Sequence, residues 1–117
     1  MGNVVQTKGL AAGLRNTAAI LTRDILASAL SRDDKRYEAA SDMILRAVWK
    51  GYREVEPDTG DTDFELDSNG LTEFLRSIEG RVLTVLEGVF PPGQQCEALK
   101  SLARQEVWET RKRVGFE

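Results

Sequence analysis

Apolar residues recur at intervals of three or four along almost the whole chain, and this spacing constrains the fold more than any other feature of the sequence. Such intervals place apolar side chains on one face of a helix, which has 3.6 residues per turn. No stretch of useful length alternates apolar and polar residues as a half-buried strand would. The sequence therefore predicts an all-α fold, in which about four helices form a compact helical bundle or hairpin assembly. The expected helices span residues 7–31, about 35–53, about 68–89 and 94 to about 114.

Short polar side chains and a Pro-Pro-Gly run mark where these helices begin and end. Asp33 or Asp34 is expected to cap the second helix, because a side-chain oxygen there accepts a hydrogen bond from a free backbone N–H group. Asp67 or Ser68 is expected to cap the third helix in the same way. The run at 91–93 then breaks the chain sharply before the last helix.

The length of 117 residues and the hydrophobic content of 41% suit a single helical domain, 1–117, with one core. In the first helix Gly9 and Gly13 each cost about 1 kcal/mol relative to alanine, so its start either frays or packs closely against a partner. The third helix is apolar around more of its circumference than one core-facing band requires. Such a helix is either central in the monomer or buried in an oligomer, and we favour an assembly completed by homo-oligomerisation. Its apolar residues are Leu71, Phe74, Leu75, Ile78, Val82, Leu83, Val85, Leu86 and Val89.

Acidic residues gather in one segment, at about 54–67, which holds seven of the 19 acids and no base. The rest of the chain has 16 basic and 12 acidic residues, a balance of +4, although the whole chain carries −3. Low hydrophobicity, high charge, Pro57 and Gly60 predict a flexible, solvated loop between the second and third helices. The alternative is a lid that competes with anions for the basic body of the domain.

Most signatures of catalysis and metal binding are missing from the sequence. There is no His, and the one Cys cannot pair within the chain, so the usual zinc sites and His-based acid–base chemistry are excluded. No glycine-rich nucleotide loop and no serine-esterase elbow occurs. Oxygen ligands at 65–70 resemble the start of a calcium loop, but Arg76 stands where that loop needs a bidentate Glu. The sequence thus predicts a protein that is not an enzyme and has no catalytic residue, cofactor or metal.

Neither a membrane nor DNA is an expected partner. No apolar run approaches the ~18–20 residues that span a bilayer, and the first residues lack the pattern of a secretory leader. We therefore expect a cytoplasmic protein. The net charge of −3 and a pI near 5.1 run against DNA binding, which is typical of strongly basic domains.

The last helix carries the strongest candidate binding surface. Lys100, Arg104 and Trp108 follow one another at intervals of four, so two cations and an indole share one side of the helix. Tyr52 and Arg53 form a comparable patch near the end of the second helix. Cations beside aromatic rings suit a phosphate-bearing base, through charge-assisted hydrogen bonds and stacking. An anionic small molecule is therefore the expected ligand.

Neighbouring residues leave a second interpretation of these patches open. Arg46, Trp49 and Lys50 extend the patch on the second helix. The aromatic residues would serve equally well as core or oligomer contacts. The bases would then be a solvated face, paired with Glu97 and Glu106.

The segment 90–108 (Phe-Pro-Pro-Gly-Gln-Gln-Cys-Glu-Ala-Leu-Lys-Ser-Leu-Ala-Arg-Gln-Glu-Val-Trp) resembles the C-terminal helix of small phage proteins that sequester immune signalling nucleotides. In these anti-CBASS and anti-Thoeris sponges, a helix opens near Ser-Leu-Ala-Leu-Thr and reaches Met-Trp ten residues after its Ala. The matching residues here are Ala98, Leu99, Leu102 and Trp108, and the departures are Cys96 for Ser, Lys100 for Thr, Val107 for Met and Arg104 for an acid.

The resemblance implies a helical homo-oligomer, often hexameric, that binds a cyclic nucleotide or a cyclic ADP-ribose derivative at subunit interfaces without cleaving it. On this hypothesis the chain is a phage counter-defence sponge. Its bases would stack on an aromatic ring while cations neutralise the phosphates. The ligand-binding residues would be Tyr52, Arg53, Lys100, Arg104 and Trp108.

A different class of function also fits the sequence. The chain would then be a helical adaptor or protein inhibitor of the anti-CRISPR kind. Its acidic segment at 54–67 would mimic nucleic acid and contact a basic partner protein.

Overall fold

Four helical rods make up most of the described part of the chain. The computed structural model describes residues 4–55 and 65–114, apart from the side chains of 4–8, 51, 53–55 and 65–66. The first rod is continuous and consists of α1 (Thr7–Ala19), the π-helical segment η1 (Ile20–Leu26) and α2 (Ala27–Ala29). The other rods are α3 (Lys35–Val55), α4 (Ser68–Val89) and α5 (Gln94–Arg113).

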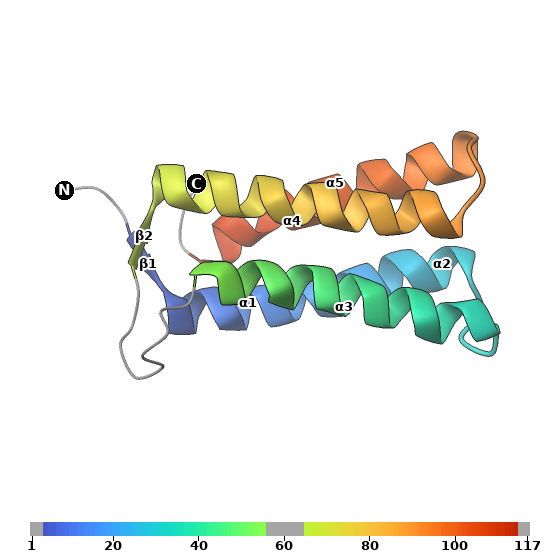
Figure 1. Ribbon diagram of the computed structural model, residues 1–117, viewed down its shortest axis with the longest axis horizontal. Coiled ribbons are helices and arrows are strands. Elements are labelled where there is room, and N and C mark those ends of the chain that lie inside the picture. The colour runs from blue at the N-terminus through green and yellow to red at the C-terminus, as the bar shows by residue number, and fades with distance from the viewer. Residues whose placement is uncertain (1–3, 56–64, 115–117) are drawn as a thin grey trace.

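The rods form an antiparallel bundle in which the chain reverses direction at each connection. In Figure 1, α4 and α5 form one layer over a second layer of α1 and α3. Each helix packs against two others, so α3 has α1 and α4 as neighbours, while α5 has α4 and α1. The described part of the chain measures 45 × 27 × 18 Å. The predicted all-α fold is confirmed.

The helix ends lie close to where the sequence places them. Asp67 caps α4, because its carboxylate accepts a hydrogen bond of 2.8 Å from the backbone N–H of Gly70. Asp34 accepts the backbone N–H of Arg36 at 2.8 Å at the start of α3. The break at 91–93 is also confirmed, since Gly93 takes a φ of 155° that only glycine adopts readily, and α5 begins at the next residue.

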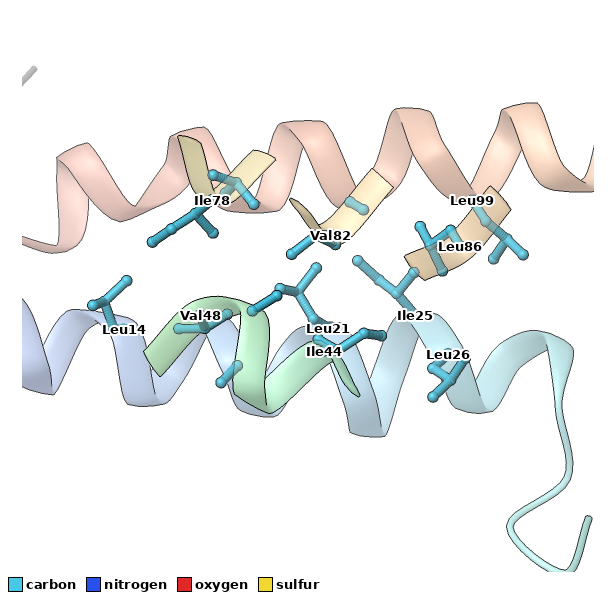
Figure 2. Packing of buried hydrophobic residues seen from close by; sticks show 14 of the residues in the cluster. Leu14, Leu21, Ile25, Leu26, Ile44, Val48, Ile78, Val82, Leu86 and Leu99 are labelled. Carbon is cyan, nitrogen blue, oxygen red and sulfur yellow. The ribbon is translucent and has the colours of Figure 1, made fainter. Parts of the chain in front are cut away.

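The core runs along the axis of the bundle. Figure 2 shows Leu21 and Ile44 of the lower layer opposite Ile78 and Val82 of the upper layer, and all four are at most 1% exposed. The extra apolar residues of α4, such as Val85, are partly buried against the same core. α4 packs against α3 and α5, and like each helix of the bundle it has two neighbours. Homo-oligomerisation stays a prediction.

Two local features lie outside the sequence prediction. β1 (Val4–Gln6) and β2 (Glu65–Asp67) form an antiparallel ladder in which Val5 pairs with Leu66, and three residues are too few to show an alternating pattern. The ladder ties the start of the first rod to the start of α4. The predicted acidic loop is therefore bounded by ordered elements, because α3 extends to Val55 and β2 begins at Glu65. The predicted flexibility of this loop concerns mainly residues 56–64, which lie outside the described residues.

Two hydrogen bonds of Thr22 accompany the π-helical segment. Thr22 donates its side-chain O–H to the carbonyl of Ala18 at 2.9 Å, and such back-bonding competes with the backbone ladder. The carbonyl of Thr22 accepts a hydrogen bond of 2.9 Å from the hydroxyl of Tyr37 on α3. A wider helical turn is thereby fixed against the neighbouring helix. π-Helical turns are rare and frequently lie at functional sites.

Candidate functional site

The cations of α5 lie toward α4, and a carboxylate occupies the position that the sequence hypothesis gives to a phosphate. Glu79 Oε1 accepts a hydrogen bond from Arg104 Nε at 2.7 Å. Glu79 Oε2 accepts one from the indole Nε1 of Trp108 at 3.3 Å. The side chain of Glu79 is only 17% exposed, so neighbouring atoms hold it in place. An anion between Arg104 and Trp108 would meet this like charge, which repels it.

Lys100 is neutralised in the same way. Its Nζ lies 3.1 Å from Glu97 Oε1 and 3.4 Å from Glu87 Oε1. The hydrogen bond to Glu97, which outweighs the opposing desolvation, raises the pKa of Lys100 above its usual value. An anionic ligand would therefore have to displace two carboxylates.

The other bases of α5 also have partners. They pair with acids of the same helix or with residues at the start of α4. On this helix the second interpretation of the bases, as a face paired with acids, describes the geometry. The contacts are Lys112 with Glu109 at 3.5 Å, Arg113 with Glu106, and Arg111 Nη1 with Thr72 Oγ1 at 2.9 Å.

The other half of the predicted site lies elsewhere in the bundle. Tyr52 is on α3, half-buried, with its ring edge-on to Trp49 at a centroid distance of 5.7 Å. Arg53 is also on α3, and its side chain lies outside the described residues. Because α3 and α5 occupy opposite corners of the bundle, the fold does not bring Tyr52 beside Trp108 (Figure 1). Within one chain the five predicted residues do not form a single site.

A groove between α3 and α4 instead gathers four basic side chains. Arg46 and Lys50 line it from α3, and Arg76 and Arg81 line it from α4. Its volume of about 630 Å³ lies in the range of small-molecule sites. Among the described residues that line it, none is acidic. The rest of the lining is small or apolar and consists of Met43, Ala47, Ser77, Gly80, Thr84 and Val85.

Three of the cations in this α3–α4 groove, Arg46, Lys50 and Arg76, are available to a ligand. Lys50 and Arg76 make no ion pair with a carboxylate of any described residue. Arg46 Nε lies 3.0 Å from Asp42 Oδ2, but the two side chains are 79% and 56% exposed. Such a solvated pair contributes about 0–1 kcal/mol and is easily exchanged for another anion. The contrast with the neutralised cations of α5 makes this groove the better anion site.

The sequence showed only half of the groove. Arg46 and Lys50 belong to the patch described on the second helix, but Arg76 and Arg81 were missed. The available signal was their position beside the small residues Ser77 and Gly80, which leave a helix surface open. That signal is weak, because the register of α3 against α4 decides which side chains meet.

The described residues offer little reactive chemistry. They contain no group of three or more carboxylates, histidines or cysteines that could hold a metal ion. Cys96 is a small buried thiol on α5, with 3% exposure. None of the described helices is long and apolar enough to cross a membrane. The α3–α4 groove itself supplies positive charge and apolar contact, which together suit binding.

No protein-family model, curated protein or solved structure matches the chain. The resemblance of segment 90–108 to the nucleotide sponges therefore stays a prediction.

Proposed function

We propose that this protein is a non-catalytic binding protein that sequesters a cyclic nucleotide or a cyclic ADP-ribose-type immune signal, as a phage counter-defence sponge. One observation carries the proposal: four basic side chains from two adjacent helices line one groove in which no described residue is acidic. Arginine and lysine bind phosphate through charge-assisted hydrogen bonds, and arginine does so with two parallel N–H groups. In this proposal Lys50 and Arg76 bind the phosphates, in place of Lys100 and Arg104, which the sequence had suggested.

The ligand class rests on two supports. The groove is large enough for a small molecule, and its apolar floor would accept the faces and edges of bases and sugars. The resemblance of segment 90–108 supplies the more specific expectation of a cyclic immune signal. Cyclic nucleotides carry their phosphates within a compact ring, which suits cations arranged on both walls of a groove.

The first experiment is thermal unfolding of the purified protein with cyclic dinucleotides, cyclic trinucleotides and cyclic ADP-ribose isomers. A ligand at 100 times its Kd adds about 2.7 kcal/mol, which raises Tm by several degrees for a domain of this size. Mass spectrometry of the recovered ligand then shows whether it is intact. A large shift with an unchanged ligand supports the proposal. A flat panel, or a cleaved ligand, contradicts it.

Two variants locate the site once a responsive ligand is known. Arg76→Glu should weaken binding by at least about tenfold, because it removes a charge-assisted bond and adds a repelling charge. Arg104→Ala should bind normally, since its partner is Glu79. Lys112→Ala, on the exposed side of α5, is the matched control for the loss of a cation. If Arg76→Glu bound the ligand normally and Arg104→Ala lost binding, the proposed groove would be wrong and the site would lie on α5.

The adaptor alternative depends on the acidic segment, most of which lies outside the described residues. Deleting residues 56–64 distinguishes the two functions. A sponge keeps its ligand, or binds it more tightly, when those carboxylates are removed. An adaptor that mimics nucleic acid loses its partner protein.

A further inference from the structure

A second groove lies on the other side of α3, between that helix and the first rod. Its lining combines Arg15 and Arg23 with the ring of Trp49, and its volume is about 340 Å³. Among the described residues that line it, none is acidic. The α3–α4 groove differs, because its described lining contains no aromatic ring. The two grooves share no lining residue and would therefore recognise different features of a ligand.

The two arginines lie toward opposite ends of this α1–α3 groove. The first rod and α3 run antiparallel (Figure 1), and Arg15 of the rod lines the groove together with Trp49 of α3. The hydrogen bond of 2.9 Å from Tyr37 to the carbonyl of Thr22 places Arg23 beside the start of α3. Eight residues separate the two arginines, which is roughly 10–12 Å along a helix. The small residues Ala18 and Ala19 leave room between them.

The two charged side chains of this groove are not paired with an acid of the described chain. Neither Arg15 nor Arg23 makes an ion pair with a carboxylate of any described residue. Trp49 is half-buried, yet its indole N–H donates no hydrogen bond to the described part of the chain. Two guanidinium groups and an indole ring that line one groove match a base that carries phosphates.

The backbone of the groove is unusual as well. Thr22 and Arg23 belong to the π-helical segment η1, which forms one wall. Such segments frequently occur at functional sites, because they shift side chains away from the positions of a regular helix.

We propose that the α1–α3 groove is a second ligand site, which takes an aromatic base bearing phosphate groups. The base lies against the ring of Trp49, and Arg15 and Arg23 bind the phosphates. This site does not depend on the proposed function, since the α3–α4 groove uses other residues. The protein would then have two anion sites, one on each side of α3. Only the site in the α1–α3 groove would require an aromatic ring.

The fluorescence of Trp49 provides the test. The chain has two tryptophans, so Trp108→Phe leaves Trp49 as the single emitter. We would titrate this variant with ATP, with pyrophosphate and with adenosine. We expect saturable quenching by ATP, and at least about tenfold weaker responses to pyrophosphate and adenosine, because each lacks one half of the recognised chemistry. Equal responses to pyrophosphate and ATP, or none to ATP, would overturn the proposal.

Three further variants assign the signal. In the Trp108→Phe background, Arg15→Glu and Arg23→Glu should each weaken the ATP response by about tenfold or more. Arg76→Glu is the matched control, because it reverses the same charge in the α3–α4 groove alone. A normal response in both Arg15→Glu and Arg23→Glu, or a comparable loss in Arg76→Glu, would overturn the second site. If Trp108→Phe does not fold, Trp49→Phe answers the same question, because it should abolish the quenching seen in the original protein.

Discussion

At the scale of single residues, one carboxylate, that of Glu79, distinguishes the basic stripe on α5 from the α3–α4 groove. Glu79 bonds to both Arg104 and Trp108, so the stripe on α5 is electrically satisfied within the chain. The next residue, Gly80, lies in the α3–α4 groove, and a side chain built there would meet nothing within 4 Å. Glu79 thus neutralises the basic stripe on α5, whereas the adjacent Gly80 leaves space in the α3–α4 groove.

Gly80 allows the groove to be filled without disturbing the backbone. We expect Gly80→Leu to reduce binding of a responsive ligand at least tenfold, because the new side chain occupies the groove. Gly88→Leu is the matched control, since Gly88 is on the same helix, has equally open surroundings and does not line the groove. Ligand-induced shifts in Tm measure both. Equal binding by the two variants would contradict the placement of the site.

The alanine variants of the same glycines test stability. Both residues lie inside α4 and neither has a positive φ. Gly80→Ala and Gly88→Ala should each raise the free energy of unfolding by about 0.5–1 kcal/mol, because alanine has less freedom to lose on helix formation. Urea denaturation measures the change. A decrease in either variant would contradict the open surroundings of these positions.

Asp34 gives the protein a defined sensitivity to acid. Its hydrogen bonds with the side chain and backbone of Arg36 lower its pKa below the usual value of 3.8. The resulting stabilisation is complete above pH 3.8 and is lost as the pH falls through the lower folded-state pKa. We expect the stability difference between the original protein and Asp34→Asn to shrink below pH 3.8, as measured by urea unfolding across pH.

Asp33→Asn is the control for this measurement. It removes a neighbouring carboxylate that accepts no hydrogen bond from the described residues. If Asp33→Asn shows the same dependence on pH, the contacts with Arg36 are not the cause.

At the scale of elements, the crossing of α1 and α5 shows how the bundle is held in register. Gly13 lets the two helices approach closely, because a Cβ there would lie 2.7 Å from Val114 Cγ1. Beside it, the hydroxyls of Thr17 and Thr110 share a hydrogen bond of 2.5 Å, and both residues are fully buried. Arg113 Nη1 also donates to Thr17 Oγ1 at 2.9 Å. The sequence predicted either fraying or close packing at this glycine, and the structure has close packing.

The same crossing predicts an effect opposite to that at Gly80. Gly13→Ala should lower the free energy of unfolding by about 1–3 kcal/mol, because the added methyl group overlaps Val114 in a packed contact. In the Val114→Ala background the same change should cost less, since the overlapping methyl group is gone. Urea denaturation of the four proteins gives the coupling. Additive effects would show that Val114 is not the obstacle.

At the scale of the whole molecule, charge and assembly are the open properties. The chain is acidic overall at −3, yet both grooves beside α3 have basic linings, so the charge is strongly uneven. The apolar excess of α4 is buried against the core within the chain. The large apolar side chains that remain exposed in the described structure are Met43, at the α3–α4 groove, and Leu102 on α5.

We still expect a homo-oligomer, with α5 at the contact between copies. Leu102 is 48% exposed, and burying a leucine contributes about 1.5–3 kcal/mol. Sedimentation equilibrium should therefore give a mass above the 13.0 kDa of one chain, and Leu102→Glu should lower it toward that value. Lys112→Glu, elsewhere on α5, is the control for added negative charge. A monomer under all conditions would make the prediction wrong.

The sequence by itself determined the helices and their ends. Apolar spacing, the Asp67 cap and the glycine at 93 act within a few residues, so they can be recognised without knowing the fold. The all-α architecture follows, because faces with this periodicity are buried by packing helices together. The ladder at Val4–Gln6 and the π-helical segment were not predictable, since one joins distant residues and the other depends on Tyr37.

Which cations can bind a ligand depends on contacts between helices. Lys100, Arg104 and Trp108 share a side of their helix, as predicted from their spacing, but Glu79 reaches them from another helix. In the α3–α4 groove, basic residues of two helices line one surface with no acid in its described lining, and Lys50 and Arg76 make no ion pair with a described carboxylate. Spacing within one helix places side chains on a face. The neighbour that packs against that face decides whether its charge is neutralised, and this contact joins residues far apart in the chain.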